Sequence, residues 1–328
     1  MTDLSWRDVL ATHYHHAAPE FLHIKRSYSL HFIYRFSGKK YVLSKVRKDP
    51  RRIPFHFQFD ITELLSLRSE TVRRAEPPVT PSSGPWVDIG SHHWFVRPYI
   101  EHDPAPDWRK PLLIRAAAHH LARIHEIAES SPNPLGEVQD GLAPYHWPIC
   151  TVLAEQNAFA ADMILRGRPR RDVATVRRNL ETLGRQAAEV ELGLTGITHQ
   201  DFRPGNILVR GGAVTGIIDW DLAHEDRYLY DAALGALHLG CHQAGSDHLS
   251  AAQLFMDVYL DRFDVKAGAE AVPWMFRFIT TRNLAVGRSP GKWRGLLREV
   301  EARWPRTGTH RVSRPRELVS ADTGSCSP

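Results

Sequence analysis

Four polar residues between positions 199 and 219 have types and spacing that suit chemistry on a phosphate group. His199, Asp201 and Asn206 lie in the segment THQDFRPGNIL, and Asp219 follows thirteen residues after Asn206 in the apolar stretch VTGIIDWD. Phosphoryl transfer needs a carboxylate that orients the acceptor hydroxyl, together with oxygen ligands for Mg²⁺. We therefore interpret Asp201 as a candidate catalytic base, and Asn206 and Asp219 as candidate metal ligands.

The same segment also has a simpler interpretation as a turn, because Asp, Pro, Gly and Asn are turn residues. Asp219 in its apolar context makes the full pattern more specific and favours the catalytic interpretation. The spacing between Asn206 and Asp219 allows a hairpin that would return Asp219 beside Asn206. Arg203 lies two positions after Asp201 and could reach a transferring phosphate with its forked donors.

These residues carry a resemblance to a known family. HQDFRPGNIL together with IIDWD resembles the aminoglycoside phosphotransferase/choline kinase family, whose members are relatives of protein kinases. LARIH at 121–125 is similar to the helix before that family's catalytic loop, and YDAALGAL at 230–237 is similar to its later helix with a structural Asp. The order of parts agrees from about residue 20 to 305. The resemblance implies a protein-kinase-like α+β fold with a small β-rich N-lobe and a larger helical C-lobe.

The resemblance also implies roles for individual residues. It makes Asp201 the catalytic base, and it gives Asn206 and Asp219 to Mg²⁺. His199 would support the loop through hydrogen bonds.

Two further carboxylates and one histidine receive supporting roles. Asp221 would either lie near the metals or cap the following helix, and the residues leave both alternatives open. Asp231 is expected to be a buried orienting carboxylate, and His125 is expected to pack in the core.

The N-lobe departs from the family pattern, because RSYSLHF offers no Gly-rich phosphate loop. Relatives often carry Lys or Arg at the fourth position of a strand such as YVLS, where this chain has Ser44 followed by Lys45. Successive strand residues point to opposite faces, so Lys45 reaches the phosphates only if the register or a bulge allows it. We nevertheless predict that Lys45 contacts the phosphates. The rival cations are Lys40, Lys48 and Arg26.

Three other N-lobe residues complete the expected nucleotide site. Glu63 would pair with the phosphate-binding lysine, although an exposed helix charge is an equally good interpretation. Tyr99 and Ile100, in VRPYIE, are expected at the hinge whose backbone groups would hold the base.

The elements that must position these residues follow from periodicity. Residues 1–100 are expected to form the N-lobe, 101–306 the C-lobe, and 307–328 a disordered tail rich in Ser, Arg, Pro and Gly. Strands are predicted in HFIYRF, YVLSKVRK, WVDIG and HHWFVRPYI. Helices are predicted at 57–75, 110–129, 151–165 and 172–191, and again within 228–305.

Composition narrows the functional classes. The 328 residues are 42% hydrophobic and 24% charged, with a formal net charge of +5 and a pI of about 9.2. No apolar run approaches the roughly 20 residues that span a bilayer, and the N-terminus lacks the order of a signal peptide. The three scattered cysteines form no disulfide framework, and a cytoplasmic protein is expected. We favour solvated basic surface over nucleic-acid binding.

The last helices bear on the acceptor. Many arginines lie there, which disfavours a polycationic acceptor and favours a neutral or anionic small molecule, such as a sugar, a nucleoside-type antibiotic or an amino-alcohol metabolite. The arginines are Arg277, Arg282, Arg288 and Arg294, and the aromatic residues that could wall the pocket, or simply pack in the core, are Trp274, Phe276 and Phe278.

The predicted function is therefore transfer of the γ-phosphate of ATP or GTP to a hydroxyl of a small molecule, with Mg²⁺, in antibiotic resistance, self-resistance or tailoring. The alternative is a catalytically weak kinase-like binding or structural protein, which the altered N-lobe favours. A protein kinase is disfavoured because no activation loop follows Asp219 in DWDLA.

Overall fold

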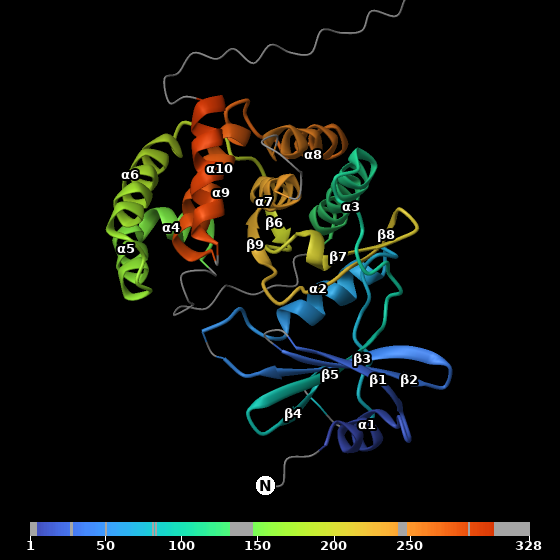
Figure 1. Ribbon diagram of the computed structural model, residues 1–328. Helices are drawn as coiled ribbons and strands as arrows, with labels where there is room; N and C mark the ends of the chain where they lie inside the picture. Colours follow the sequence, from blue (N-terminus) through green and yellow to red (C-terminus); the bar gives the residue numbers. More distant parts are fainter. Residues whose placement is uncertain are drawn as a thin grey trace, which may run out of the picture.

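The chain has two lobes in the computed structural model, which describes residues 5–26, 29–49, 51–80, 82, 84–131, 147–241, 248–287 and 289–304. A five-stranded sheet forms the lobe at the N-terminal end, and a bundle of helices forms the other lobe (Figure 1). This arrangement confirms the expected α+β bilobal fold. The tail expected from residue 307 lies outside the described residues.

The N-lobe sheet is antiparallel throughout, in the order β1-β2-β3-β5-β4. Its strands are β1 (Glu20–Arg26), β2 (Leu30–Phe36), β3 (Lys39–Arg47), β4 (Val87–Ile89) and β5 (His92–Pro98). Helix α1 (Trp6–Tyr14), which begins at a capping box on Ser5, packs on one face of the sheet with Leu43 and Trp94. The opposite face is left for the cavity between the lobes.

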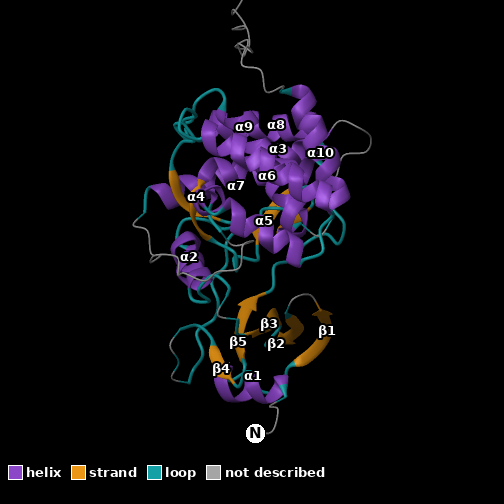
Figure 2. Ribbon diagram, turned by 90° about the vertical axis from the view of Figure 1, so that its left-hand side faces the viewer, coloured by secondary structure: helices purple, strands orange, loops and turns teal. Residues whose placement is uncertain are grey.

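Helix α2 (Phe57–Ser66) lies between the sheet and the helical bundle (Figures 1 and 2). The expected helix over 57–75 is too long, because the backbone after Ser66 finds other partners. The carbonyl of Thr71 accepts the N–H of Ile217 at 2.8 Å, and Glu76 pairs with Val96 of β5.

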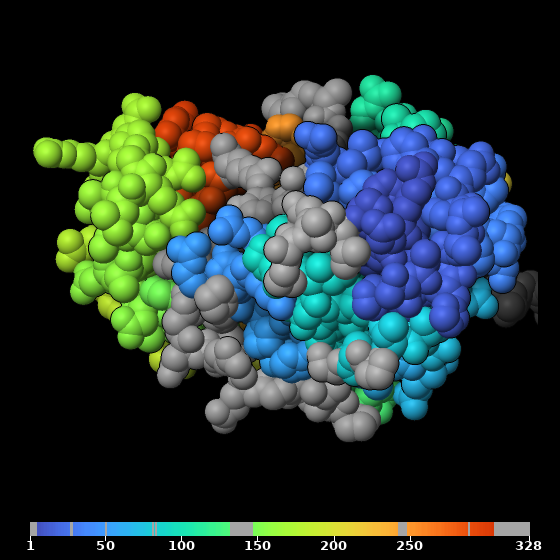
Figure 3. All heavy atoms as spheres, turned by 90° about the horizontal axis from the view of Figure 1, so that it is seen from below, coloured from blue at the N-terminus to red at the C-terminus, as the bar shows by residue number. Residues whose placement is uncertain are grey.

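The C-lobe core is built mainly from amphipathic helices whose apolar faces meet in one large cluster. The helices are α3 (Pro111–Glu129), α4 (Ile149–Ala154), α5 (Gln156–Leu165), α6 (Arg170–Gln186), α7 (Tyr228–Gly240), α8 (His248–Arg262), α9 (Ala271–Val286) and α10 (Pro290–Arg303). The helix expected over 151–165 is divided at Glu155, whose ψ of 37° is not helical. Viewed from the N-lobe end, the green helices α5 and α6 extend to one side of the blue N-lobe (Figure 3).

Short strands interrupt the helices between α6 and α7. Strand β6 (Thr195–Thr198) pairs with β9 (His224–Arg227), a ladder that the sequence patterns did not predict. After the 3₁₀ turn η2 (Pro204–Asn206), strands β7 (Ile207–Arg210) and β8 (Ala213–Ile217) form the expected hairpin. Its turn residues Gly211 and Gly212 have φ of 58° and 85°, which suits glycine.

Two further features concern the described residues. Among the described helices, none combines the length and apolar character that crossing a bilayer requires. Cys150 and Cys241, the two described cysteines, are free thiols.

Candidate active site

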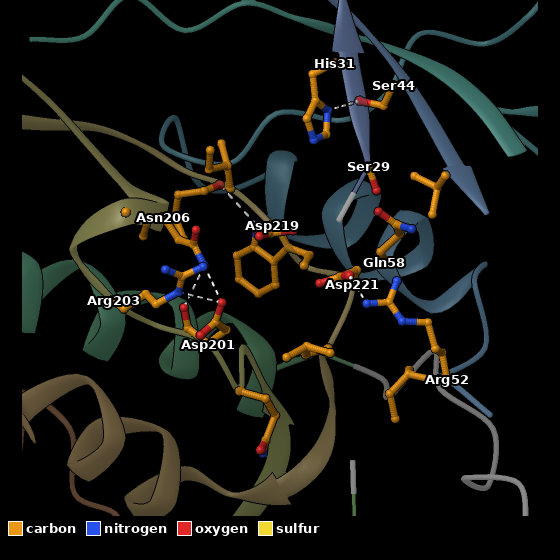
Figure 4. Close-up of a pocket in the computed structure, with 18 of the residues that line it drawn as sticks. Ser29, His31, Ser44, Arg52, Gln58, Asp201, Arg203, Asn206, Asp219 and Asp221 are labelled. Atoms are coloured by element: carbon orange, nitrogen blue, oxygen red, sulfur yellow. Dashed lines mark hydrogen bonds and ion pairs between the residues drawn. The ribbon is translucent and has the colours of Figure 1, made fainter. Parts of the chain in front are cut away.

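A cavity of about 1870 Å³ lies between the lobes, with walls from the N-lobe sheet, the segment 200–222 and helices α7, α9 and α10. It contains the carboxylates of Asp201, Asp219 and Asp221 on the C-lobe side (Figure 4). Its volume exceeds that of most single-ligand pockets and is sufficient for two ligands side by side.

The carboxylate of Asp201 is held from one side by its own loop. Its Oδ2 accepts hydrogen bonds of 2.8 Å from both Asn206 Nδ2 and Arg203 Nε (Figure 4). The same Asn206 nitrogen donates to the Asp201 carbonyl at 2.9 Å. Within the described part of the chain, no hydrogen bond engages Oδ1 of Asp201. This second oxygen is therefore free to accept a hydrogen bond from a ligand hydroxyl.

Asn206 and Asp219 are adjacent because the β7–β8 hairpin returns the chain. The N–H of Ile218 donates to the Asn206 carbonyl at 3.0 Å. Asp219 itself has a left-handed backbone with φ of 70°. Since the Asn206 amide nitrogen is committed to Asp201, its amide oxygen remains available as a metal ligand.

Asp221 adds a third carboxylate to this part of the cavity. Burial, and secondarily the charge of Asp219, raise the pKa of Asp221 to about 7, although Arg52 opposes the shift from 3.5 Å. Helix α7 begins at Tyr228 with Arg227 as its N-cap, so Asp221 does not cap it. A divalent cation would relieve the crowding of negative charge between Asp219 and Asp221.

The donor set suits Mg²⁺ better than a transition metal. Within the described residues, no three His, Cys, Asp or Glu side chains gather into a closed metal site. Mg²⁺ commonly takes one or two carboxylates and completes its shell with water and phosphate oxygens. Asn206, Asp219 and Asp221 offer oxygens of that kind.

His199 ties the catalytic loop to the strand before Asp219. Its Nε2 lies 2.9 Å from the carbonyl of Ile218, and its Nδ1 accepts the N–H of Asp201 at 3.3 Å. These two bonds require the neutral tautomer with hydrogen on Nε2. The imidazole therefore holds the loop and is not free to remove a proton.

Asp231, on α7, organises the start of the catalytic loop from beneath. This fully buried carboxylate accepts the N–H groups of His199 at 2.7 Å and Gln200 at 2.9 Å, and it lies 3.1 Å from His125 Nε2. Burial alone would raise the pKa of Asp231, but these hydrogen bonds and the nearby histidines lower it below its usual value. His125, expected as simple packing, is thus a hydrogen-bonded member of this network.

Two N-lobe side chains do not lie where their expected roles would place them. The Lys45 ammonium lies 4.9 Å from the centre of the Trp94 ring, on the sheet face that α1 covers, because strand alternation turns Ser44 and not Lys45 toward the cavity. Ser44 Oγ instead pairs with His31 Nδ1 at 2.9 Å (Figure 4). Glu63 is exposed and bonds to Arg74 at 2.9 Å, so its alternative interpretation as a surface charge fits.

The rival cations are also engaged or distant. Lys40 pairs with Glu101 at 2.7 Å, and Lys48 pairs with Asp88 at 3.2 Å. Arg26 is exposed on β1 and does not line the cavity.

The hinge segment lies at an apolar end of the cavity. Tyr99 and Ile100 both line it, together with Ile33, Val42, Leu208 and Ile217. The Tyr99 N–H bonds to the Lys40 carbonyl at 3.0 Å, and the Ile100 carbonyl accepts from His102 at 2.8 Å. Flat apolar walls from both lobes suit a planar aromatic ring between them.

Two cavity residues escaped the sequence analysis, Arg97 on β5 and Gln58 on α2. Arg97 Nη2 donates to Gln58 Oε1 at 3.1 Å. Strand alternation could have found Arg97, since it lies two residues from Phe95 on the cavity face of β5.

Comparisons with known proteins agree with this geometry. A structure of a thermostable mutant of aminoglycoside phosphotransferase APH(4)-Ia in complex with ADP and hygromycin B matches with a TM-score of 0.62 and 13% identity, over 91% of this chain and 97% of that chain. The microcompartment-associated aminopropanol kinase matches with 0.60 and 18%, over 87% and 88% of the two chains. Spectinomycin phosphotransferase APH(9)-Ia, in complex with ADP and spectinomycin, matches with 0.54 and 13%, over 89% and 92%.

At these identities the solved structures establish the fold alone. No curated protein matches the chain in sequence. The sequence profile of the phosphotransferase enzyme family, however, matches residues 34–261, which is more than half of the chain and includes the catalytic loop and Asp219. The chain therefore belongs to the phosphotransferase enzyme family.

Proposed function

We propose that this protein transfers the γ-phosphate of ATP to a hydroxyl group of a small molecule, with Mg²⁺ as the metal. The observation that carries the proposal is the Asp201 carboxylate, which is fixed through Oδ2 and open at Oδ1, beside Asn206 and Asp219. Two similar solved structures hold ADP, one together with hygromycin B and the other together with spectinomycin, which supports ATP as donor over GTP.

Each group then has one task. The hinge and the apolar walls hold the nucleobase, and Asn206, Asp219 and Asp221 would hold Mg²⁺, which neutralises phosphate charge when bound. Asp201 accepts a hydrogen bond from the acceptor hydroxyl through Oδ1 and receives its proton as the bond between that oxygen and the γ-phosphorus forms. The bond from the γ-phosphorus to the β,γ-bridging oxygen breaks in the same transfer, and ADP leaves. Arg203, whose pKa is raised by Asp201 although burial opposes this, remains a cation beside the transferring group.

We take the part of the cavity lined by α7, α9 and α10 as the acceptor side, and it has a positive charge pattern. The described carboxylates that line the whole cavity are Asp49, Asp201, Asp219 and Asp221, and none of them belongs to these three helices. The basic side chains lining it there include Lys292, His238 and the largely buried Arg282, which also donates to the Tyr230 hydroxyl at 2.6 Å. This pattern supports a neutral or anionic acceptor, because a polycationic antibiotic would meet like charge.

The other residues expected around the acceptor have structural contacts. Arg277 donates to the Trp304 carbonyl at 2.7 Å, and Arg294 forms a two-bond pair with Asp172, while Arg288 lies outside the described residues. The aromatic residues Trp274, Phe276 and Phe278 are buried in the core, and the tryptophans among the described residues that line the cavity are Trp220 and Trp293.

A panel of hydroxyl compounds tests the proposal. Nucleotide consumption with Mg·ATP is measured for sugars, nucleoside-type antibiotics, anionic alcohols, amino alcohols and polycationic aminoglycosides. We expect the best neutral or anionic acceptor to exceed every polycation by at least about tenfold in kcat/KM. A polycation as the best acceptor would contradict the acceptor class, and Mg·ATP binding without turnover across a broad panel would favour a binding protein.

The metal assignment predicts a ranking of two variants. Asp219→Ala should weaken magnesium-dependent nucleotide binding by more than about tenfold, and Asn206→Ala should weaken it less, because a charged ligand contributes more than a neutral one. Nucleotide affinity titrated against magnesium measures both. An unchanged magnesium dependence in Asp219→Ala would remove Asp219 from the metal site.

A further inference from the structure

Arg97 is a cation inside the cavity without an acidic partner. Among the described residues, no carboxylate lies within ion-pair distance of its guanidinium. Its described hydrogen bond goes to the neutral side chain of Gln58, and its Nε is buried without any hydrogen-bond partner in the described structure. A partly buried cation whose Nε–H is buried and unpartnered is costly unless an anion joins it.

The surroundings keep Arg97 charged and fixed. Its guanidinium stacks against Phe95, 4.8 Å from the ring centre, and lies 5.4 Å from the ring centre of Phe59. Burial lowers the pKa of Arg97 to about 10, while the charges of Asp219 and Asp221 oppose the shift. The side chain is therefore a cation at neutral pH, held across the cavity from the carboxylates that would bind magnesium.

Other N-lobe cations that line the cavity are less suited to a bound anion. Arg52 contacts Asp221 and Lys48 contacts Asp88. Lys25, Arg47 and Arg73 are exposed, so water screens their charge. Arg97 alone among these combines a partly buried side chain, aromatic walls and a buried Nε–H donor without a partner.

We propose that Arg97 binds the β- and γ-phosphates of the triphosphate, and that Gln58 positions it. The inference rests on the proposed function. A neutral partner such as Gln58 orients the guanidinium without cancelling its charge, so the full charge remains for the phosphates. The cation is thus supplied from β5, while the β3 position where relatives often carry Lys or Arg holds the uncharged Ser44.

Binding measurements separate a phosphate contact from a structural role. Calorimetry with Mg·AMP-PNP and with adenosine is performed on the wild type, Arg97→Met and Arg97→Lys, with circular dichroism to confirm folding. We expect Arg97→Met to weaken AMP-PNP binding by at least tenfold and adenosine binding by less than twofold. Arg97→Lys should fall between the wild type and Arg97→Met. The matched control is Arg35→Met, which removes an exposed cation paired with Glu20 and should leave both affinities unchanged.

A second experiment moves the positive charge from β5 to β3 and tests whether AMP-PNP affinity returns. Val42, the register partner of Arg97, and Ser44 line the same side of β3, so a lysine at position 44 lies diagonally across from Arg97. The double variant Arg97→Met with Ser44→Lys should bind AMP-PNP at least threefold more tightly than Arg97→Met alone.

Several outcomes would overturn the assignment. Unchanged AMP-PNP binding in Arg97→Met would do so, and so would equal losses for AMP-PNP and adenosine. A larger loss in Lys45→Met than in Arg97→Met would return the role to Lys45. If the wild type bound no AMP-PNP, the proposed function itself would be wrong. If the wild type bound AMP-PNP and Arg97→Met bound it equally well, only this inference would be overturned.

Discussion

An Asp201→Asn variant is expected to lose phosphate transfer almost completely while it still folds and binds nucleotide. The substitution keeps the shape of the side chain and its contact with Asn206, but an amide cannot take the proton of the acceptor hydroxyl. General-base contributions of this kind amount to about 10²–10⁴-fold in rate. Single-turnover transfer to the best acceptor, measured beside Mg·AMP-PNP affinity, separates chemistry from binding.

Asp49→Asn is the matched control for this experiment. Asp49 also lines the cavity, but it bonds to the backbone N–H of Arg51 at 3.0 Å, away from the catalytic loop. Its substitution should change the rate by less than about threefold, a difference below roughly 1 kcal/mol. Near-normal turnover in Asp201→Asn would remove Asp201 from the role of base.

The largest effect on folding is expected from Asp231→Ala. The variant leaves the N–H groups of His199 and Gln200 without an acceptor in the buried core, and it removes the partner of His125. Removing one member of a buried polar network costs about 3–5 kcal/mol. Urea unfolding should show this loss in the free energy of unfolding, and activity should fall with it because the loop start is no longer held.

Asp264→Ala provides the comparison, since Asp264 is an exposed aspartate that pairs with Lys266 on the surface. Its free energy of unfolding should match the wild type within error. A loss below about 1 kcal/mol in Asp231→Ala would show that the network contributes little. The lowered pKa of Asp231 also gives a pH dependence: its stabilisation is fully present above the unfolded pKa of about 3.9 and is lost as pH falls from there through the lower pKa of the folded state.

The catalytic loop could be predicted from sequence because its parts are local. His199, Asp201 and Asn206 lie within one short segment, and a two-stranded hairpin is enough to bring Asp219 back. Spacing along the chain therefore determined most of the geometry. The structure added what is not local, namely the contact of His125 with Asp231 across 106 positions.

The N-lobe could not be predicted in the same way. Which side chain enters the cavity depends on the face of β3, where a shift of one residue exchanges Ser44 for Lys45. It also depends on the pairing of β3 with β5, which brings Arg97 beside Val42 although the two are far apart in sequence. No local motif marks such a pair. The end of α2 was missed for a related reason, since Thr71 bonds to the distant Ile217.

The left-handed backbone at Gln200 and Asp219, with φ of 64° and 70°, limits how these positions can vary in evolution. Such a conformation costs a residue with a side chain about 1–2 kcal/mol, and only glycine adopts it freely. At position 219 glycine would remove the carboxylate, so the strain there cannot be relieved without loss of the proposed metal ligand. β-Branched residues are excluded at both positions. The loop is thus confined to few sequences, while the described residues of α7, α9 and α10 include no such left-handed position and can vary more freely.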